Sequence, residues 1–433
     1  MIRSEVPVAA PGTHGISHSR RNTYALIFLI GFALRLGFVI WAHTYVGDAN
    51  TTNPFGAEVC RIASHIAAGD GFRSPFHGAD TGPSAWVAPA YPYFVAVVFR
   101  LFGSYSRASA LILLSLQCAV AAATGVAISA LATRSLGQQV GLWAAWIWTL
   151  SPIFFRWPAT WIWDFAASAL LLTLAFIVTL DTAENGGTAN WLRLAGVWGL
   201  SALTNPALLS LLPFSFFHAA WANHKSHPRY IRRLIYAVIL FGAIVSPWLV
   251  RNYLVFGQAV FLRDNFWFEF SLGNYRFSNG MGWAGKHPDK NPLVHEQVVQ
   301  LGEPAFIEYH KKEALDFVRQ YPREFLGLSL RRAWWFWDGT SLFYQGNEWW
   351  KPWEFWPLSL AGWLGLLFAL TRRPRGWFLY AAALLIYPAP YYLSYPQPKY
   401  RYAIEPELLL LAVYLVFVLW GEISKHRTAR HAN

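Results

Sequence analysis

Stretches of about twenty apolar residues recur along the whole chain, and this recurrence limits its fold more than any other feature. A bilayer core is ~30 Å thick, and a helix needs roughly twenty apolar residues to span it. Charged residues make up 13% of the 433 residues and hydrophobic residues 55%, whereas a soluble domain carries about 25% charge. The sequence therefore predicts an all-α polytopic membrane protein.

We place about ten crossing segments in the sequence. The motif TNP, which ends at Pro206, is expected to divide the apolar stretch 191–221 into two crossings, because proline cannot donate a helical backbone hydrogen bond. The other expected crossings are 24–43, 108–131, 140–155, 162–180, 234–250, 353–370, 377–393 and 405–420.

The formal net charge is +12, which in a soluble protein would suggest a nucleic-acid partner. Here Lys and Arg cluster in short loops beside the apolar stretches, as the positive-inside rule describes. Ten crossings place the basic N-terminal SRRN, the loops NHKSHPRYIRR and TRRPRG, and the tail EISKHRTARH on the same side. We therefore expect both termini in the cytoplasm and no nucleic-acid partner.

This topology divides the chain into five parts. They are a cytoplasmic tail at 1–23, seven crossings at 24–250 with a large outer loop at 44–107, an outer segment at 251–352, three crossings at 353–421, and a cytoplasmic tail at 422–433. In the outer segment, GEPAFIEYHKKEALDFVRQYP and FLGLSLRRAWWFWDG are typical of amphipathic helices. The second carries Arg331 and Arg332 beside tryptophans, which favours a helix lying in the membrane interface.

The first outer loop is too polar and too rich in Gly and Pro to cross a bilayer. It holds two acids close to the expected membrane surface, Asp48 and Glu58, and a predicted short helix at 58–68. We interpret this loop as half of an active site. The two cysteines, Cys60 and Cys118, lie in the loop and in an apolar stretch, so they indicate neither a disulfide framework nor a thiolate metal site.

Several short motifs follow one another along residues 33–406. They are Arg35 in the first crossing, an acid after it, an RIA helix with a GxGF turn at 69–72, APAYPYFVAVVFRLFG, the acid of WIWDFAASALLLTL, LTNP, PWLVRNYLVFG and PKYRYAIEP. Their order resembles that of the GT-C membrane glycosyltransferases, especially bacterial relatives of the protein O-mannosyltransferases and of the lipid A aminoarabinose transferase. The resemblance implies a GT-C-like bundle with its active site on the outer face.

The resemblance also implies a reaction, the transfer of a sugar from a polyprenyl phosphate to a hydroxyl group of a lipid, glycan or protein acceptor. A carboxylate must take the acceptor proton, and Glu58 is our first candidate, with Asp48 as the alternative. Asp164 matches the second acid of the family. It would orient the acceptor or help to bind a divalent metal at the donor phosphate, and metal dependence stays open because the histidines form no HExxH-type cluster.

Cationic side chains are candidates for the donor phosphate, because Arg can bind a phosphate with two parallel hydrogen bonds and Lys acts as a point charge. Arg35 lies in the middle of the first crossing, where it is costly unless it faces the bundle interior, and an acid such as Asp164 could pair with it there. Including Arg35, the candidate substrate-binding residues are Arg35, Arg61, Tyr91, Arg251, Lys399 and Arg401.

Two positions depart from the family pattern. Relatives carry an Asp-Glu pair where this chain has Phe55-Gly56, and a lysine where it has Val87. The changed acid pair keeps open the alternative of a catalytically degenerate GT-C protein. A transporter or flippase of lipid-linked glycans is a further alternative, although such proteins show inverted repeats and polar residues near the bilayer midplane, and we find no repeat.

Overall fold

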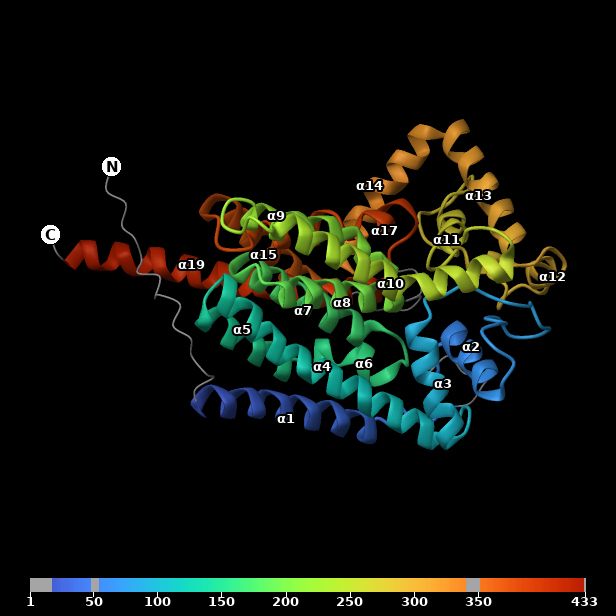
Figure 1. Ribbon diagram of the computed structural model, residues 1–433, viewed down its shortest axis with the longest axis horizontal. Helices are drawn as coiled ribbons and strands as arrows, with labels where there is room; N and C mark the ends of the chain where they lie inside the picture. The colour runs from blue at the N-terminus through green and yellow to red at the C-terminus, as the bar shows by residue number, and fades with distance from the viewer. Residues whose placement is uncertain (1–17, 48–53, 340–350, 432–433) are drawn as a thin grey trace.

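The computed structural model describes residues 18–47, 54–339 and 351–431. Long helices form one bundle, and shorter helices pack at one end of it (Figure 1). The helices of the bundle are α1 (His18–Trp41), α4 (Arg107–Ser135), α5 (Gln138–Leu150), α7 (Phe165–Asn185), α8 (Thr188–Thr204), α9 (Leu212–Asn223), α10 (Tyr230–Phe256), α15 (Lys351–Arg372), α16 (Trp377–Leu385) and α19 (Glu405–His431).

The shorter helices belong to the connections at the polar end of the bundle. They are α2 (Ala57–Ala68), α3 (Ala90–Phe102), α6 (Arg156–Thr160), α11 (Phe266–Gly273), α12 (Pro292–Leu301), α13 (Glu303–Gln320), α14 (Pro322–Asp338), α17 (Ala389–Leu393) and α18 (Pro398–Arg401). Four 3-10 helices complete the described part of the chain, η1 (Pro152–Phe154), η2 (Pro206–Leu211), η3 (Ala284–Lys286) and η4 (Tyr402–Ile404).

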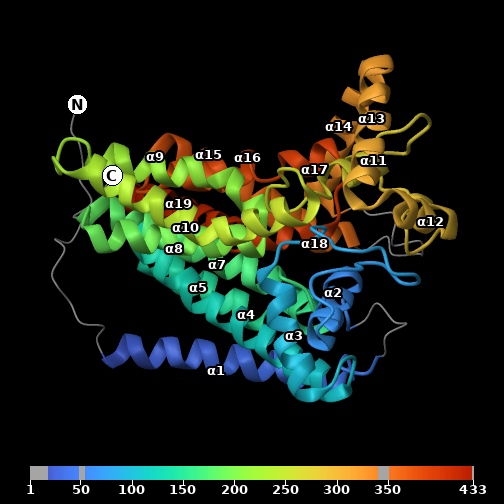
Figure 2. The same cartoon turned by 45° about the vertical axis from the view of Figure 1, so that its right-hand side comes forward.

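Consecutive bundle helices run back and forth along the long axis of the molecule (Figures 1 and 2). As a result their connections alternate between two ends. The connections 136–137, 186–187, 224–229 and 373–376 lie at the end where α1 begins and α19 ends. The polar segments 54–106 and 257–339 lie together at the opposite end, so residues far apart in the sequence meet there.

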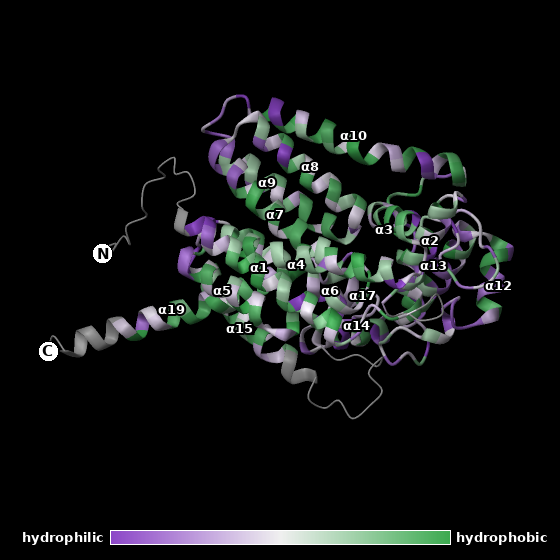
Figure 3. Cartoon of the chain, turned by 90° about the horizontal axis from the view of Figure 1, so that it is seen from below, coloured by the Kyte–Doolittle hydropathy of each residue, from purple (hydrophilic) through white to green (hydrophobic). Residues whose placement is uncertain are grey.

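Six helices within the described residues are long and apolar enough to cross a membrane. They are Arg20–Trp41, Arg107–Ser135, Phe165–Asn185, Tyr230–Phe256, Phe355–Arg372 and Pro398–Ser424. Hydrophobic residues dominate the bundle helices and hydrophilic residues gather toward α2, α12 and α13 (Figure 3). The other four expected crossings fall on the shorter helices α5, α8, α9 and α16, so the count of ten is not established by length and composition.

Several local predictions from the sequence are confirmed. Helix α2 spans Ala57–Ala68, and the two amphipathic segments form α13 and α14. The TNP motif ends α8 at Thr204, and the side chain of Asn205 caps η2 by accepting a hydrogen bond from the backbone N–H of Ala207 at 3.2 Å. Within α14 the side chain of Arg332 points into the protein, where it is fully buried. It donates hydrogen bonds to backbone carbonyls, among them that of Gly280 at 2.8 Å. The interfacial position of the helix stays a prediction.

Close packing in the bundle depends on small residues. A Cβ atom at Gly141 of α5 would lie 2.8 Å from the carbonyl oxygen of Ser129 in α4, and one at Gly125 of α4 would lie 3.3 Å from Ile27 of α1. Between helices in a membrane, packing of this kind replaces the hydrophobic effect as the main source of association. These contacts hold α1, α4 and α5 together and position the segment that follows α5.

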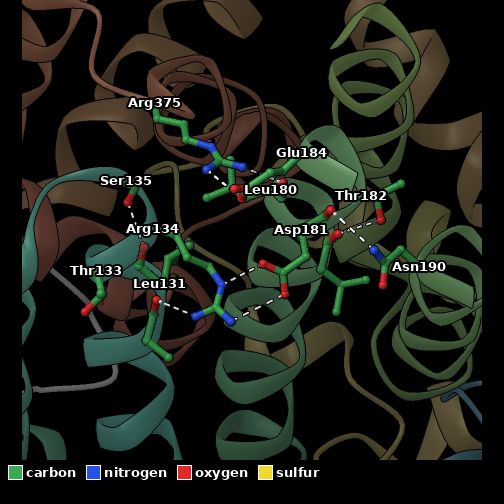
Figure 4. Close-up of polar contacts among 12 residues, drawn as sticks. Leu131, Thr133, Arg134, Ser135, Leu180, Asp181, Thr182, Glu184, Asn190 and Arg375 are labelled. Carbon is green, nitrogen blue, oxygen red and sulfur yellow. Dashed lines mark hydrogen bonds and ion pairs between the residues drawn. The ribbon is translucent and has the colours of Figure 1, made fainter. Parts of the chain in front are cut away.

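Ion pairs fasten the end of the bundle where α1 begins (Figure 4). The Nε atom of Arg134 in α4 lies 2.7 Å from Asp181 in α7, and Arg375 lies 2.9 Å from Glu184 of the same helix. Arg375 also donates a hydrogen bond to the carbonyl of Leu180 at 2.8 Å. Because these side chains are about one third exposed, each pair contributes little free energy alone, but together they fix α7 against α4 and the 373–376 connection.

Candidate active site

A cavity of about 760 Å³ opens at the polar end of the bundle. Its wall is formed by the starts of α2 and α7, the connection after α8, the segment around α11, and residues 387–403. Four acids line it, Glu58, Asp164, Glu269 and Asp289. Basic side chains line it as well, among them Arg61, Arg156, Arg263, His287 and Lys399. Aromatic side chains form another large part of the wall, among them Trp86, Trp161, Trp163, Tyr391, Tyr395 and Tyr400.

A short backbone bridge brings the first outer loop to the corner before α7. Phe55 pairs with Ile162 in a parallel β-bridge, and the backbone N–H of Ile162 donates to the carbonyl of Pro54 at 2.7 Å. A Cβ atom at Gly56 would lie 2.5 Å from the carbonyl oxygen of Ile162, so this position accepts no side chain without movement. The bridge therefore explains why position 56 is a glycine, and it brings Glu58 and Asp164 into the same cavity.

Glu58 forms an ion pair with His287. The Oε1 atom of Glu58 lies 3.3 Å from Nε2 of His287, and the two side chains are 16% and 19% exposed. Burial opposes the charged form of both groups, but the hydrogen bond and the opposite charge outweigh it. The pKa of Glu58 is consequently lowered and the pKa of His287 raised. At neutral pH Glu58 is thus a carboxylate in the cavity wall.

Asp164 directly precedes the apolar helix α7 and is buried. Its carboxylate accepts a hydrogen bond from the Ser168 hydroxyl at 3.2 Å, and the Asn205 amide donates to the same Ser168 oxygen at 3.1 Å. Burial raises the pKa of Asp164 to about 6, against the opposing effects of the Arg263 charge and the Ser168 hydrogen bond. Asp164 is therefore ionised at neutral pH and titrates close to it.

Glu269, on the first turn of α11, is the third acid of the cavity. Its carboxylate accepts hydrogen bonds from the Tyr395 hydroxyl at 2.5 Å and from the Asn265 amide at 3.3 Å. Burial raises its pKa, while the Tyr395 hydrogen bond and the His287 charge act in the opposite direction. Glu269 joins the outer segment to the turn before α18 and keeps one face toward the cavity.

Lys399 and Arg263, which both line the cavity, make no ion pair with the described residues. Nζ of Lys399 lies 4.1 Å from the centroid of the Trp161 ring and 5.7 Å from that of Trp163. Arg263 lines the same cavity and also makes no hydrogen bond with the part of the chain described here. In contrast, Arg61 is engaged, with Nη1 2.5 Å from Asp289. Lys399 and Arg263 therefore have donor groups available for an anion.

The acids of the cavity do not gather into a metal-ligand set. No group of three or more His, Cys, Asp or Glu side chains within the described residues is arranged to hold a metal ion. Glu58, Asp164 and Glu269 instead have separate partners, His287, Ser168 and Tyr395. These residues do not fit a divalent metal in their present arrangement, so we assign no step to one.

The structure gives Arg35 a different role from the expected one. Its side chain is fully buried but does not line the cavity. Its guanidinium donates to the carbonyls of Trp148 at 2.7 Å and Gly31 at 3.1 Å, and lies 4.5 Å from the centroid of the Phe155 ring. Helix α5 ends at Leu150, so its last carbonyls lack helical partners. Arg35 satisfies them in place of the expected acid.

Three other substrate-binding candidates also lie away from the cavity lining. Arg251 donates to the carbonyls of Ser84 at 2.7 Å and Phe72 at 2.9 Å. Arg401 is fully buried and donates to Glu405 at 2.6 Å, and the hydroxyl of Tyr91 donates to the side chain of Gln117. Of the remaining candidates, Glu58, Asp164, Arg61 and Lys399 share the cavity, and Asp48 lies outside the described residues.

Sequence reasoning missed several cavity residues, among them Arg263, Glu269 and His287. These three lie in the polar outer segment after α10, where residue order gives no sign of which side chains turn toward the bundle. The adjacent pair Arg263 and Asp264, just before the aromatic run FWFEF, was the available signal. A charged pair next to a strongly apolar helix indicates that at least one of the charges has a buried partner.

Comparisons with known proteins identify the fold but no family. No protein-family model matches the chain, and no curated protein matches it. The archaeal oligosaccharyltransferase AglB from Archaeoglobus fulgidus, in complex with an inhibitory peptide and a dolichol-phosphate, is similar over 96% of this chain and 52% of its own. The TM-score is 0.54 and the identity 13%. The same enzyme tethered with an acceptor peptide gives a TM-score of 0.52 at 13% identity, over 95% of this chain and 51% of its own.

A weaker similarity links the chain to ArnT from Cupriavidus metallidurans bound to undecaprenyl phosphate. It covers 92% of this chain and 78% of that one, with a TM-score of 0.41 and 13% identity. This chain spans about half the length of the oligosaccharyltransferase it matches. The matches to AglB show a GT-C-like fold, as the order of motifs led us to expect.

Proposed function

We propose that this chain is an inverting glycosyltransferase that moves a sugar from a polyprenyl-phosphate-linked donor to a hydroxyl acceptor at the outer face of the membrane. One observation carries the proposal, namely that carboxylates and available cations line the same aromatic cavity of a GT-C-like fold. AglB, which shares the fold, was solved with a dolichol-phosphate. ArnT, whose similarity is too weak to support an argument, was solved with undecaprenyl phosphate.

Lys399 and Arg263 would bind the phosphate of the donor. The departing polyprenyl phosphate carries negative charge, which positioned cations stabilise most effectively in a site with little water. Arg263 can offer two parallel hydrogen bonds, and Lys399 a point charge held over Trp161. The charges of both cations act on Asp164 and oppose the rise of its pKa.

Glu58 would act as the general base. The acceptor oxygen attacks the anomeric carbon, the bond from that carbon to the phosphate oxygen breaks, and the acceptor proton passes to the carboxylate. The polyprenyl phosphate leaves as an anion, and the in-line displacement inverts the anomeric centre. His287 keeps Glu58 ionised before the reaction. Asp164 would orient the acceptor hydroxyl, and Asp48 stays a predicted alternative base.

The aromatic wall would hold the sugar ring. Trp86 is buried in the wall beside Phe76, with ring centroids 4.7 Å apart. An aromatic face contributes contact area to a sugar without restricting the orientation of every hydroxyl. The proposed acceptor classes are lipids, cell-wall polymers, other glycans and proteins.

The proposed function also implies how the chain is oriented in the membrane. We infer ten crossings, with both termini on the cytoplasmic side of a bacterial inner membrane and the cavity on the outer side. Basic residues support this orientation, since Arg134, Arg233 and Arg375 all lie at the end opposite the cavity. The positive-inside rule assigns such an end to the cytoplasm.

A donor panel tests the proposal. Purified protein in detergent would be incubated with radiolabelled polyprenyl phosphates carrying different sugars, and the released polyprenyl phosphate and the anomeric configuration of the product would be measured. Release with inverted configuration from at least one donor is the expected result. Movement of intact donor between the leaflets of a vesicle, with no sugar release, would favour a flippase instead.

A further inference from the structure

Two carboxyl groups behind the cavity wall, Asp264 and Glu303, face each other in the protein interior. Glu303 is 2% exposed. Both carboxylate oxygens of Asp264 are inaccessible to solvent and receive no hydrogen bond from the described residues. Both residues bond to Ala85, Glu303 to its backbone N–H and Asp264 to its carbonyl, and the charge of Asp264 acts on Glu303. Two carboxylates placed this close offer only acceptors to each other. One proton between them would supply the missing donor and remove the repulsion.

The pair connects the first outer loop to the segment before α11. Glu303, in the first turn of α13, accepts hydrogen bonds from the Ser84 hydroxyl at 2.6 Å and from the backbone N–H of Ala85. The carbonyl of Ala85 accepts in turn from the backbone N–H of Asp264 at 3.2 Å. Figure 2 shows this loop, in light blue, running beside α11 and α12.

The residues next to these contacts belong to the cavity. Trp86 follows Ala85, Arg263 precedes Asp264, and both line the cavity wall. The cavity therefore has one aromatic and one cationic wall residue whose backbones are held by the carboxyl pair. Neither Asp264 nor Glu303 lines the cavity, so their influence on it passes through these two neighbours.

The charges around the pair support one carboxylate but not two. From α10, Arg251 donates to the Ser84 carbonyl at 2.7 Å and favours negative charge on Glu303. The N-terminus of α13 favours the same charge through the helix dipole. Burial raises the pKa of both acids, to about 6 for Asp264, and for Glu303 the Asp264 charge adds to the effect. Such a pair loses its protons in two coupled steps.

We propose that Asp264 and Glu303 share one proton, which fastens the first outer loop to the segment carrying Arg263 and so positions Arg263 and Trp86 in the cavity wall. The proposal concerns the folded chain itself and does not depend on the sugar-transfer function. Both acids titrate higher in the folded than in the unfolded protein. Their contribution to stability is therefore fully present below their ordinary pKa values and is lost as pH rises through the folded values.

Hydrogen exchange measures this fastening directly. Asp264→Asn keeps a hydrogen-bond donor facing Glu303 without a titrating proton. Exchange in a peptide covering residues 82–90 would be compared between wild type and variant at the same pH, so that the chemical pH dependence of exchange cancels. The ratio of the wild-type to the variant exchange rate in this peptide is expected to be near one at about pH 5. It is expected to rise roughly threefold or more by about pH 8.

A second variant and a control keep the test decisive. In Glu303→Gln the amide donates to Asp264 while its oxygen still accepts from Ala85. The ratio of wild-type to variant exchange is therefore expected to rise with pH for Glu303→Gln as well, even if Asp264→Asn folds poorly. Asp70→Asn changes an acid whose side chain is 52% exposed and should leave the ratio at one throughout. A ratio that stays constant with pH for both Asp264→Asn and Glu303→Gln would overturn the proposal that Asp264 and Glu303 share a proton.

Discussion

The Nζ atom of Lys399 lies 4.1 Å from the centroid of the Trp161 ring, in a cavity that Glu58, Asp164 and Glu269 also line. Lys399 comes from the short helix α18 and Trp161 from the corner before α7. The ring face favours a cation but offers it no hydrogen bond. The ammonium donors of Lys399 thus stay available for a donor phosphate while the side chain is already positioned.

Replacing Lys399 should weaken binding of the donor phosphate. Removing a cation that contacts a desolvated phosphate costs about 2–3 kcal/mol, so Lys399→Ala should weaken undecaprenyl phosphate binding roughly 30-fold or more. Lys399→Arg should recover part of the loss. Lys312→Ala is the matched control, since Lys312 is exposed on α13. Isothermal titration of the protein in nanodiscs would measure the three variants, and equal affinity for Lys399→Ala and wild type would exclude this role.

The loss of donor turnover at low pH should reflect protonation of Asp164. Its carboxylate must be ionised to orient an acceptor hydroxyl, and its pKa is raised to about 6 by burial. Donor turnover should therefore fall as pH drops through about 6. The Ser168 hydroxyl stabilises the ionised form, so Ser168→Ala should move this loss of turnover upward by ~0.5–1 pH unit.

The control for this shift is Ser115→Ala, because the Ser115 hydroxyl donates to the Leu111 carbonyl of its own helix. The profiles of kcat/KM would be compared, since they report groups of the free enzyme. A loss of turnover at the same pH in wild type and Ser168→Ala would argue against Asp164 as the titrating group.

Gly56 should tolerate no side chain. A Cβ atom there would lie 2.5 Å from the Ile162 carbonyl oxygen, so Gly56→Ala must separate the first outer loop from the corner before α7. We expect a loss of about 1–3 kcal/mol in stability and a larger loss of turnover, because Glu58 would move relative to Asp164. Gly37→Ala is the control, since a Cβ at Gly37 meets no atom within 4 Å. Equal melting temperatures for both variants in detergent would contradict the bridge.

Arg35 should matter for stability rather than for substrate. Arg35→Ala leaves the Trp148 carbonyl and its neighbours unpaired inside the bundle, which we expect to cost about 2–4 kcal/mol. Binding of undecaprenyl phosphate, measured at a temperature where the variant is folded, should be unchanged. Weakened binding by a folded Arg35→Ala protein would return this residue to the substrate site.

Sequence reasoning reached the fold because apolar length and charge distribution follow directly from the bilayer. It also assigned Glu58, Asp164, Arg61 and Lys399 to the same outer face, since their motifs lie on the same side of the predicted topology. It could not separate cavity cations from structural ones. A buried arginine is costly unless it finds acceptors, and the carbonyls that Arg35 and Arg251 bind belong to a helix end and a loop, which residue order does not mark.

The outer segment was the harder part to predict. His287 and Glu269 enter the cavity from a stretch that has no motif, and their partners, Glu58 and Tyr395, are distant in sequence. A pairing of this kind depends on how the two outer segments pack on each other. It becomes visible only when both are placed against the same end of the bundle.

Single-turnover release of polyprenyl phosphate by Glu58→Gln tests the central claim most directly. The isosteric amide keeps the shape of the wall but cannot accept the acceptor proton, and removing a general base typically slows a reaction about 10²–10⁴-fold. Undecaprenyl phosphate binding should persist, because Lys399 and Arg263 are unchanged. Release slowed at least a hundredfold with binding retained is the predicted result. Release at the wild-type rate would show that Glu58 is not the base and that the proposed mechanism is wrong.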